Sequence, residues 1–78
     1  MHEVDTKALQ IAMINADIEN IEQLSEKSGI NRNTTADVVK GRIYPSSKVM
    51  EAFKIALGLT SEQAGAIFFK EKVALDAN

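Results

Sequence analysis

The side chains that most often carry out enzymatic chemistry are few in this sequence. His2 is the only histidine and there is no cysteine, so no nucleophile with a neighbouring base can be assembled from them. Glu19, Glu22 and Glu26 are spaced three and four residues apart, which places carboxylates side by side on a helix. Without other ligands they make a poor metal cage. We expect no enzyme, cofactor or metal site, and interpret these acids as a solvated face or an acidic patch for a basic partner.

The basic residues, in contrast, are concentrated in the middle of the chain. Residues 1–29 contain two lysines and six acids, for a charge of −4, and residues 55–78 contain two lysines and three acids, for −1. Residues 30–54 contain five basic residues and two acids, for +3, which gives the overall −2. The basic residues of this middle third are Arg32, Lys40, Arg42, Lys48 and Lys54. Because phosphate contacts supply most non-specific affinity for DNA, this third favours binding to a nucleic acid.

Two short predicted helices precede or contain the first of these basic residues. Asn20 can cap a helix over residues 21–28, and Gln23 lies three residues later, as in a capping box. Asn31 can cap a second helix over residues 32–40. Only a glycine and an isoleucine separate the first helix from the second cap. Two helices joined by so short a turn must cross steeply, which is the helix-turn-helix arrangement.

From Leu24 to Ser46 the sequence resembles the phage repressor and Cro class of helix-turn-helix regulators, the Xre-type domain. The residues that carry the resemblance are Leu24, Ser25, Gly29, Ile30, Asn31, Gly41, Pro45 and Ser46. The similarity continues through residues 57–60 and covers roughly residues 6–70. The resemblance implies an all-α, five-helix, lambda-repressor-like domain.

Apolar residues at helical spacing agree with this class. We expect a single domain over residues 1–78, with helices at about 6–16, 21–28, 32–40, 47–57 and 61–74. The core face predicted for the first helix consists of Leu9, Ala12, Met13 and Ala16, widened by Ile11 and Ile14. The face predicted for the fourth helix consists of Val49, Met50, Phe53, Ala56 and Leu57. Ile43 is interpreted as a core residue and His2 as part of a disordered terminus.

The resemblance also implies how the chain would contact DNA. In this family the N-terminal residues of the recognition helix enter the major groove. The positions that match the base-facing ones are Arg32, Asn33, Ala36 and Asp37. These residue types can read guanine, adenine, the thymine methyl and cytosine, respectively. The residues expected at the phosphate backbone are Lys40, Arg42, Tyr44, Ser46 and Lys48. The implied partner is a double-stranded DNA operator, and the implied mechanism is operator occupancy in a genetic switch.

The predicted fifth helix has two apolar faces. At about 100° per residue, Ala64, Ile67, Phe68 and Leu75 share one face. Nearly opposite lie Ala66, Phe69 and Val73. A helix on the surface of a small domain needs only one apolar face. We therefore expect the second face to form a homodimer interface, which suits a palindromic operator.

A second interpretation keeps the scaffold but replaces DNA with a protein partner. The net charge of −2, Asp37, and Ile21, which stands where the family often has a polar phosphate contact, argue against DNA. A phage antirepressor, or modulator of repression, would bind a phage repressor protein and cover its DNA-binding surface. Its partner-binding residues would be Ile21, Glu22, Thr35 and Asp37. An antitoxin is a lesser alternative.

No segment of the sequence predicts a membrane or secreted location. There is no run of 18 apolar residues that could span a bilayer. The N-terminal residues are charged and lack the apolar stretch of a signal peptide. We therefore expect a cytoplasmic protein, without membrane contact, that acts on DNA in a bacterial host cell.

Overall fold

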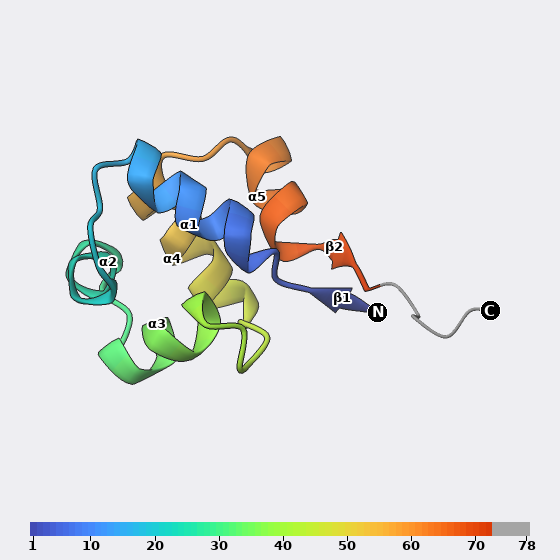
Figure 1. Ribbon diagram of the computed structural model, residues 1–78, viewed down its shortest axis with the longest axis horizontal. Coiled ribbons are helices and arrows are strands. Elements are labelled where there is room, and N and C mark those ends of the chain that lie inside the picture. Colours follow the sequence, from blue (N-terminus) through green and yellow to red (C-terminus); the bar gives the residue numbers. More distant parts are fainter. Residues whose placement is uncertain (73–78) are drawn as a thin grey trace.

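Residues 1–72 are those described by the structure, a computed structural model, and they form five helices and two short strands. In chain order these are β1 (His2–Glu3), α1 (Thr6–Asn15), α2 (Ile21–Ser28), α3 (Arg32–Val39), α4 (Ser47–Leu57), α5 (Ser61–Phe68) and β2 (Lys70–Glu71). Figure 1 shows their course from the N-terminus to the end of β2. The helical content agrees with the expected all-α class, whereas the small sheet was not predicted.

A side chain caps the N-terminus of each helix in the described part of the chain. The caps are Asp5, Asn20, Asn31, Ser46 and Thr60. At Thr60 the predicted capping box with Gln63 is complete. At Asn20 the side chain accepts a hydrogen bond from the Gln23 N–H at 2.8 Å, but the Gln23 side chain accepts from Glu19 instead, at 2.7 Å. The caps satisfy amide groups that a first helical turn leaves without partners, so the helix starts follow from local sequence.

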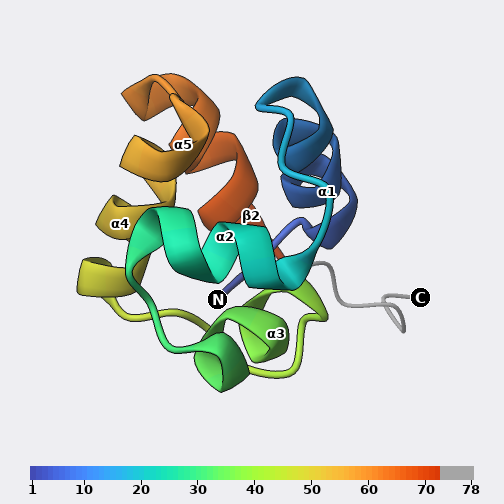
Figure 2. The same cartoon turned by 90° about the vertical axis from the view of Figure 1, so that its left-hand side faces the viewer.

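The core lies where all five helices meet. Its fully buried side chains are Leu9, Leu24, Thr35, Val38, Phe53 and Phe68. The predicted core stripes of α1 and α4 contribute Leu9 and Phe53, as expected. Figures 1 and 2 show α3 at the lower edge of the molecule, below α1 and α5. Because only one side of α3 faces the core, its other side is left at the surface.

Two isoleucines that were predicted to widen the core face of α1 are exposed. Ile11 is 52% and Ile14 is 70% exposed. At about 100° per residue both lie roughly opposite the stripe that contains Leu9 and Met13. The prediction was wrong because α1 packs through a single stripe. Ile18, in the turn after α1, is buried instead and joins the core.

The two ends of the described chain pair as an antiparallel sheet. His2 lies opposite Glu71 and Glu3 lies opposite Lys70. The backbone N–H that follows β2 donates to the carbonyl of Met1 at 3.1 Å. The expectation that His2 belongs to a disordered terminus was therefore wrong. Strands of two residues are too short to show the alternation by which a sequence reveals a strand.

α5 ends at Phe68, whereas the predicted fifth helix ran to residue 74. The Ile67 carbonyl accepts from the Asp5 N–H at 2.7 Å, and the Phe68 carbonyl accepts from the Tyr44 hydroxyl at 2.5 Å. The last carbonyls of a helix need such partners. The predicted continuation of the helix beyond Phe68 was wrong, because these carbonyls accept hydrogen bonds from distant segments and not from a further helical turn.

Candidate nucleic-acid interface

A short turn joins α2 to α3. α2 ends at Ser28 and is capped by Gly29, whose φ of 76° is left-handed. The Ile30 carbonyl accepts from the Ser25 hydroxyl at 2.6 Å and from the Thr35 hydroxyl at 3.3 Å, so one carbonyl in the turn connects both helices. In Figure 1 α2 is seen end-on while α3 runs across the view. The two helices therefore cross steeply, as the length of the turn led us to expect.

α3 has one buried side and one side open to solvent. The buried residues are Thr35, Val38 and Val39. Arg32 and Asn33 are exposed, whereas Ala36 and Asp37 are half-buried. At about 100° per residue Asn33 and Asp37 lie opposite the buried residues and Ala36 lies at their flank, whereas Arg32, in the first turn of α3, lies at the border of the buried side. None of the four is buried, and Arg32 and Asn33 are the most accessible.

Asp37 and Arg42 form an ion pair that the sequence analysis did not predict. The Arg42 guanidinium lies 3.3 Å from the Asp37 carboxylate, and the Arg42 backbone N–H donates to the Asp37 carbonyl at 2.8 Å. The pair joins the end of α3 to the loop that follows, and a spacing of five residues across a helix end gives no recognisable pattern. Asp37, a predicted base contact, and Arg42, a predicted phosphate contact, are thus bonded to each other in the free chain.

The remaining predicted phosphate contacts surround the loop and the start of α4. Lys40, Ser46 and Lys48 are exposed, and Arg42 is 60% exposed at its side chain. The Ser46 hydroxyl accepts from the Val49 N–H at 3.3 Å and caps α4, which has 11 residues. Positive side chains and a helix N-terminus both attract anions.

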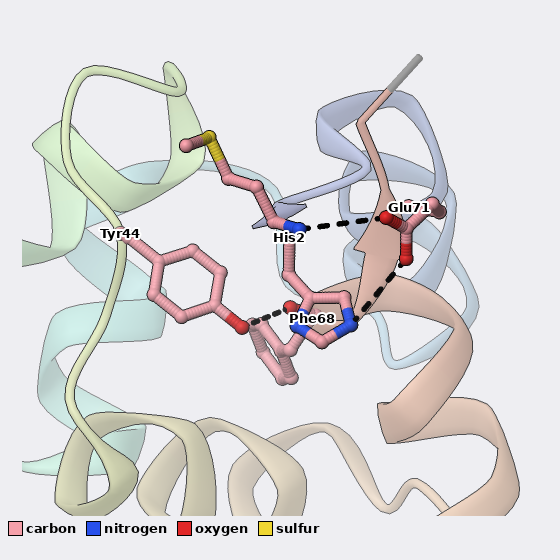
Figure 3. Close-up of polar contacts among 5 residues, drawn as sticks. His2, Tyr44, Phe68 and Glu71 are labelled. Carbon is pink, nitrogen blue, oxygen red and sulfur yellow. Dashed lines mark hydrogen bonds and ion pairs between the residues drawn. The ribbon is translucent and has the colours of Figure 1, made fainter.

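Tyr44 differs from the other predicted phosphate contacts because its hydroxyl is already used. It donates to the carbonyl of Phe68 at 2.5 Å, as Figure 3 shows. Its remaining capacity is that of an acceptor, which a phosphate does not need. Tyr44 therefore positions the loop against the end of α5. The neighbouring Ile43 is 43% exposed, so its assignment to the core was wrong: the loop turns this side chain outward.

The residues of the second interpretation do not form one surface. Thr35 is 0% exposed and its hydroxyl donates to a backbone carbonyl, so its assignment as a partner contact was wrong. Glu22 is exposed and Ile21 is half-buried. Ile21 lines an apolar cleft of about 400 Å³ between α1 and α2, and Ile14 and Glu19 also line it.

The predicted dimer residues lie in different places. Ala66 lines a cleft between α1 and α5, whereas Phe69 lines a cleft between α4 and α5. Because α5 ends before Phe69, the helical spacing that grouped the two residues does not continue. The Phe69 ring also makes an edge contact with the His2 ring, with centroids 5.5 Å apart. Val73 lies outside the described residues.

Comparison of the chain with protein-family models, with curated proteins and with solved structures finds no match. Within residues 1–72, no group of three or more His, Cys, Asp or Glu side chains lies close enough together to hold a metal ion. No helix in that part of the chain is both long and apolar enough to cross a membrane. What the described residues bring together is a surface of hydrogen-bond donors and positive charge around α3 and its following loop.

Proposed function

We propose that this protein is a helix-turn-helix regulator of the phage repressor and Cro type that occupies a double-stranded DNA operator. In this proposal α2 and α3 form the helix-turn-helix unit, and α3 is the recognition helix. Arg32 and Asn33 read bases in the major groove. Lys40, Arg42 and Lys48 contact phosphates on its flank. The protein acts in the cytoplasm of a bacterial host, without catalysis.

The observation that carries this proposal is the position of the exposed face of α3. Arg32 and Asn33 are exposed at the start of α3, and Lys40 and Arg42 are exposed at its end and in the loop that follows. These four residues belong to the segment 30–54, the third of the chain with a charge of +3, from five basic residues and two acids. The side chains proposed to read bases and those proposed to contact phosphates are thus exposed along one helix and its following loop, which supports the proposal.

The test is operator binding by the variant Arg32→Ala. We expect the affinity for the cognate operator to fall by about 1–3 kcal/mol and the base preference to relax at one position. Lys54→Gln is the control, because it removes the same charge from the last turn of α4, where the ammonium group donates to the Ser61 hydroxyl at 3.0 Å. If both variants bind the operator as the parent does, Arg32 is not a base-reading residue.

A second candidate function is that of an antirepressor, which would bind a phage repressor protein. The apolar cleft beside Ile21 favours it, because Glu19 lies at the cleft and Glu22 follows on the exposed side of α2. An apolar cleft with acids nearby is complementary to a DNA-binding surface that carries apolar and basic side chains.

The two candidates are distinguished by one measurement on Ile21→Glu and one on the parent protein. If the chain is an antirepressor, this variant loses its affinity for the repressor, measured by titration of the purified proteins, and no longer displaces the repressor from DNA. If the chain is itself the DNA-binding regulator, the parent binds operator DNA in the absence of any repressor.

A further inference from the structure

We propose that a cleft between the loop after α3 and the paired chain ends binds a phosphate group of the DNA backbone. This inference rests on the proposed function. The cleft has a volume of about 390 Å³. Its polar lining includes His2, Thr6, Lys40, Arg42, Tyr44 and Lys72. In Figure 1 the loop lies between α3 and β1, so the cleft adjoins the proposed recognition surface.

The charge at this cleft is opposite in sign to that of the whole chain. Lys40, Arg42 and Lys72 line it together with one acid, Glu3, and Asp37 pairs with Arg42 at 3.3 Å, which leaves one net positive charge when histidine is neutral, against −2 for the chain. Lys72 reaches the cleft from the end of β2, far from Lys40 in sequence. The fold therefore gathers positive charge that the sequence disperses.

Hydrogen bonds hold the two walls of the cleft in place before any ligand arrives. The Tyr44 hydroxyl donates to the Phe68 carbonyl, which fixes the loop to the end of α5 (Figure 3). The pairing of β1 with β2 holds the N-terminal wall. At Gly41, with φ of +76°, a Cβ would lie 3.1 Å from the Thr6 methyl, so the loop packs closely on the start of α1. A site built in this way loses little entropy when it binds.

The donors at the cleft select for an anion with several acceptor oxygens. The backbone amides of Gly41 and Arg42 already donate within the chain, to Val38 and Asp37, so binding must use side chains. Ammonium and guanidinium groups form charge-assisted hydrogen bonds with phosphate oxygens. Since Lys40 and Arg42 adjoin α3, a phosphodiester of the DNA that α3 reads is the occupant within reach. The DNA contact then extends from α3 to the chain ends.

The test compares Lys72→Gln with Lys70→Gln. Both remove one positive charge from the exposed end of β2, but Lys70 does not line the cleft. We expect Lys72→Gln to weaken operator binding about threefold to tenfold and to reduce the salt dependence by about one phosphate contact. We expect Lys70→Gln to resemble the parent. Equal effects of the two variants, or none, would overturn the proposal.

A second titration separates this proposal from the proposed function. If the parent does not bind DNA even at low salt, DNA regulation fails, and with it the assignment of a DNA phosphate. Inorganic phosphate is then added while the amide signals of residues 40–44 are followed by NMR, with chloride as the ionic-strength control. Saturable shifts that Lys72→Gln abolishes identify a site for free phosphate. Absence of such shifts removes the anion site altogether.

Discussion

The ion pair of Asp37 and Arg42 controls how much positive charge the end of α3 offers to a ligand. The two side chains are 37% and 60% exposed and lie 3.3 Å apart. Exposed pairs of this kind contribute only about 0–1 kcal/mol to stability, because water screens them and ordering two side chains costs entropy. The effect of the pair is therefore on binding more than on folding. To reach a phosphate, Arg42 must leave Asp37, and Asp37 is then left beside the negative backbone.

The variant Asp37→Asn tests this effect. We expect tighter binding to DNA of arbitrary sequence, by several-fold at low salt, because Arg42 is released and one negative charge is removed. The free energy of unfolding should change by less than about 1 kcal/mol. Fluorescence anisotropy with a labelled random duplex checks the first expectation. Glu62→Gln, in the first turn of α5 and away from α3, controls for the overall charge; an equal gain there would assign the effect to net charge alone.

At the scale of elements, Gly41 determines how α3 connects to α4. Its φ of +76° is a conformation that other residues adopt at a cost, and an added Cβ would lie 3.1 Å from the Thr6 methyl. We expect Gly41→Ala to lower the free energy of unfolding by about 2 kcal/mol or more.

Gly65 provides the matched comparison. It lies inside α5, and an added Cβ would meet nothing within 4 Å. We expect Gly65→Ala to raise the free energy of unfolding by about 0.5–1 kcal/mol, because alanine has the higher helix propensity. Urea denaturation of both variants checks that the free energy of unfolding falls in Gly41→Ala and rises in Gly65→Ala. An unchanged free energy of unfolding in Gly41→Ala would contradict the prediction and would show that the loop relaxes away from α1.

The sequence could predict those elements whose causes are local. The starts of α2, α3 and α5 follow from Asn20, Asn31 and Thr60, which bond to amides three residues or fewer away. The end of α5 could not be predicted, because the carbonyls of Ile67 and Phe68 accept hydrogen bonds from segments near residues 5 and 44. Partners so distant in sequence leave no periodic pattern.

The same distinction applies to the candidate site. The resemblance to the phage repressor class placed Arg32 and Asn33 at outward positions, and the structure has both exposed. The sequence analysis assigned separate roles to Asp37 and Arg42 and did not predict their ion pair, because the pair depends on the conformation of the loop. Lys72 was not considered, since its approach to Arg42 depends on the pairing of the chain ends.

At the scale of the whole molecule, the uneven distribution of charge is the property that matters for binding. The chain carries −2 overall, yet α3, its following loop and the cleft beside β1 gather basic side chains. Phosphate attraction falls off within about 8–10 Å at physiological salt, so the local surface matters more than the total charge. A chain of this kind is expected to bind DNA with one face only.

At the same scale we predict a homodimer, because paired half-sites require two recognition helices. Ala66 and Phe69 line different clefts, so one two-fold contact covers only one of them. Phe69, an aromatic residue that is 52% exposed, is the stronger candidate. We expect Phe69→Glu to give a monomer and Ala66→Glu to remain dimeric in sedimentation velocity experiments. A monomeric parent, at concentrations that saturate the operator, would contradict this prediction.

Binding of the purified parent protein to DNA tests the central claim most directly. A labelled fragment from the region upstream of the protein's own gene is titrated at two salt concentrations, and anisotropy is recorded. We predict strong binding that weakens steeply as salt rises, because each phosphate contact releases counterions. Absence of binding at the lower salt concentration would contradict DNA regulation and would favour a protein partner at the cleft beside Ile21.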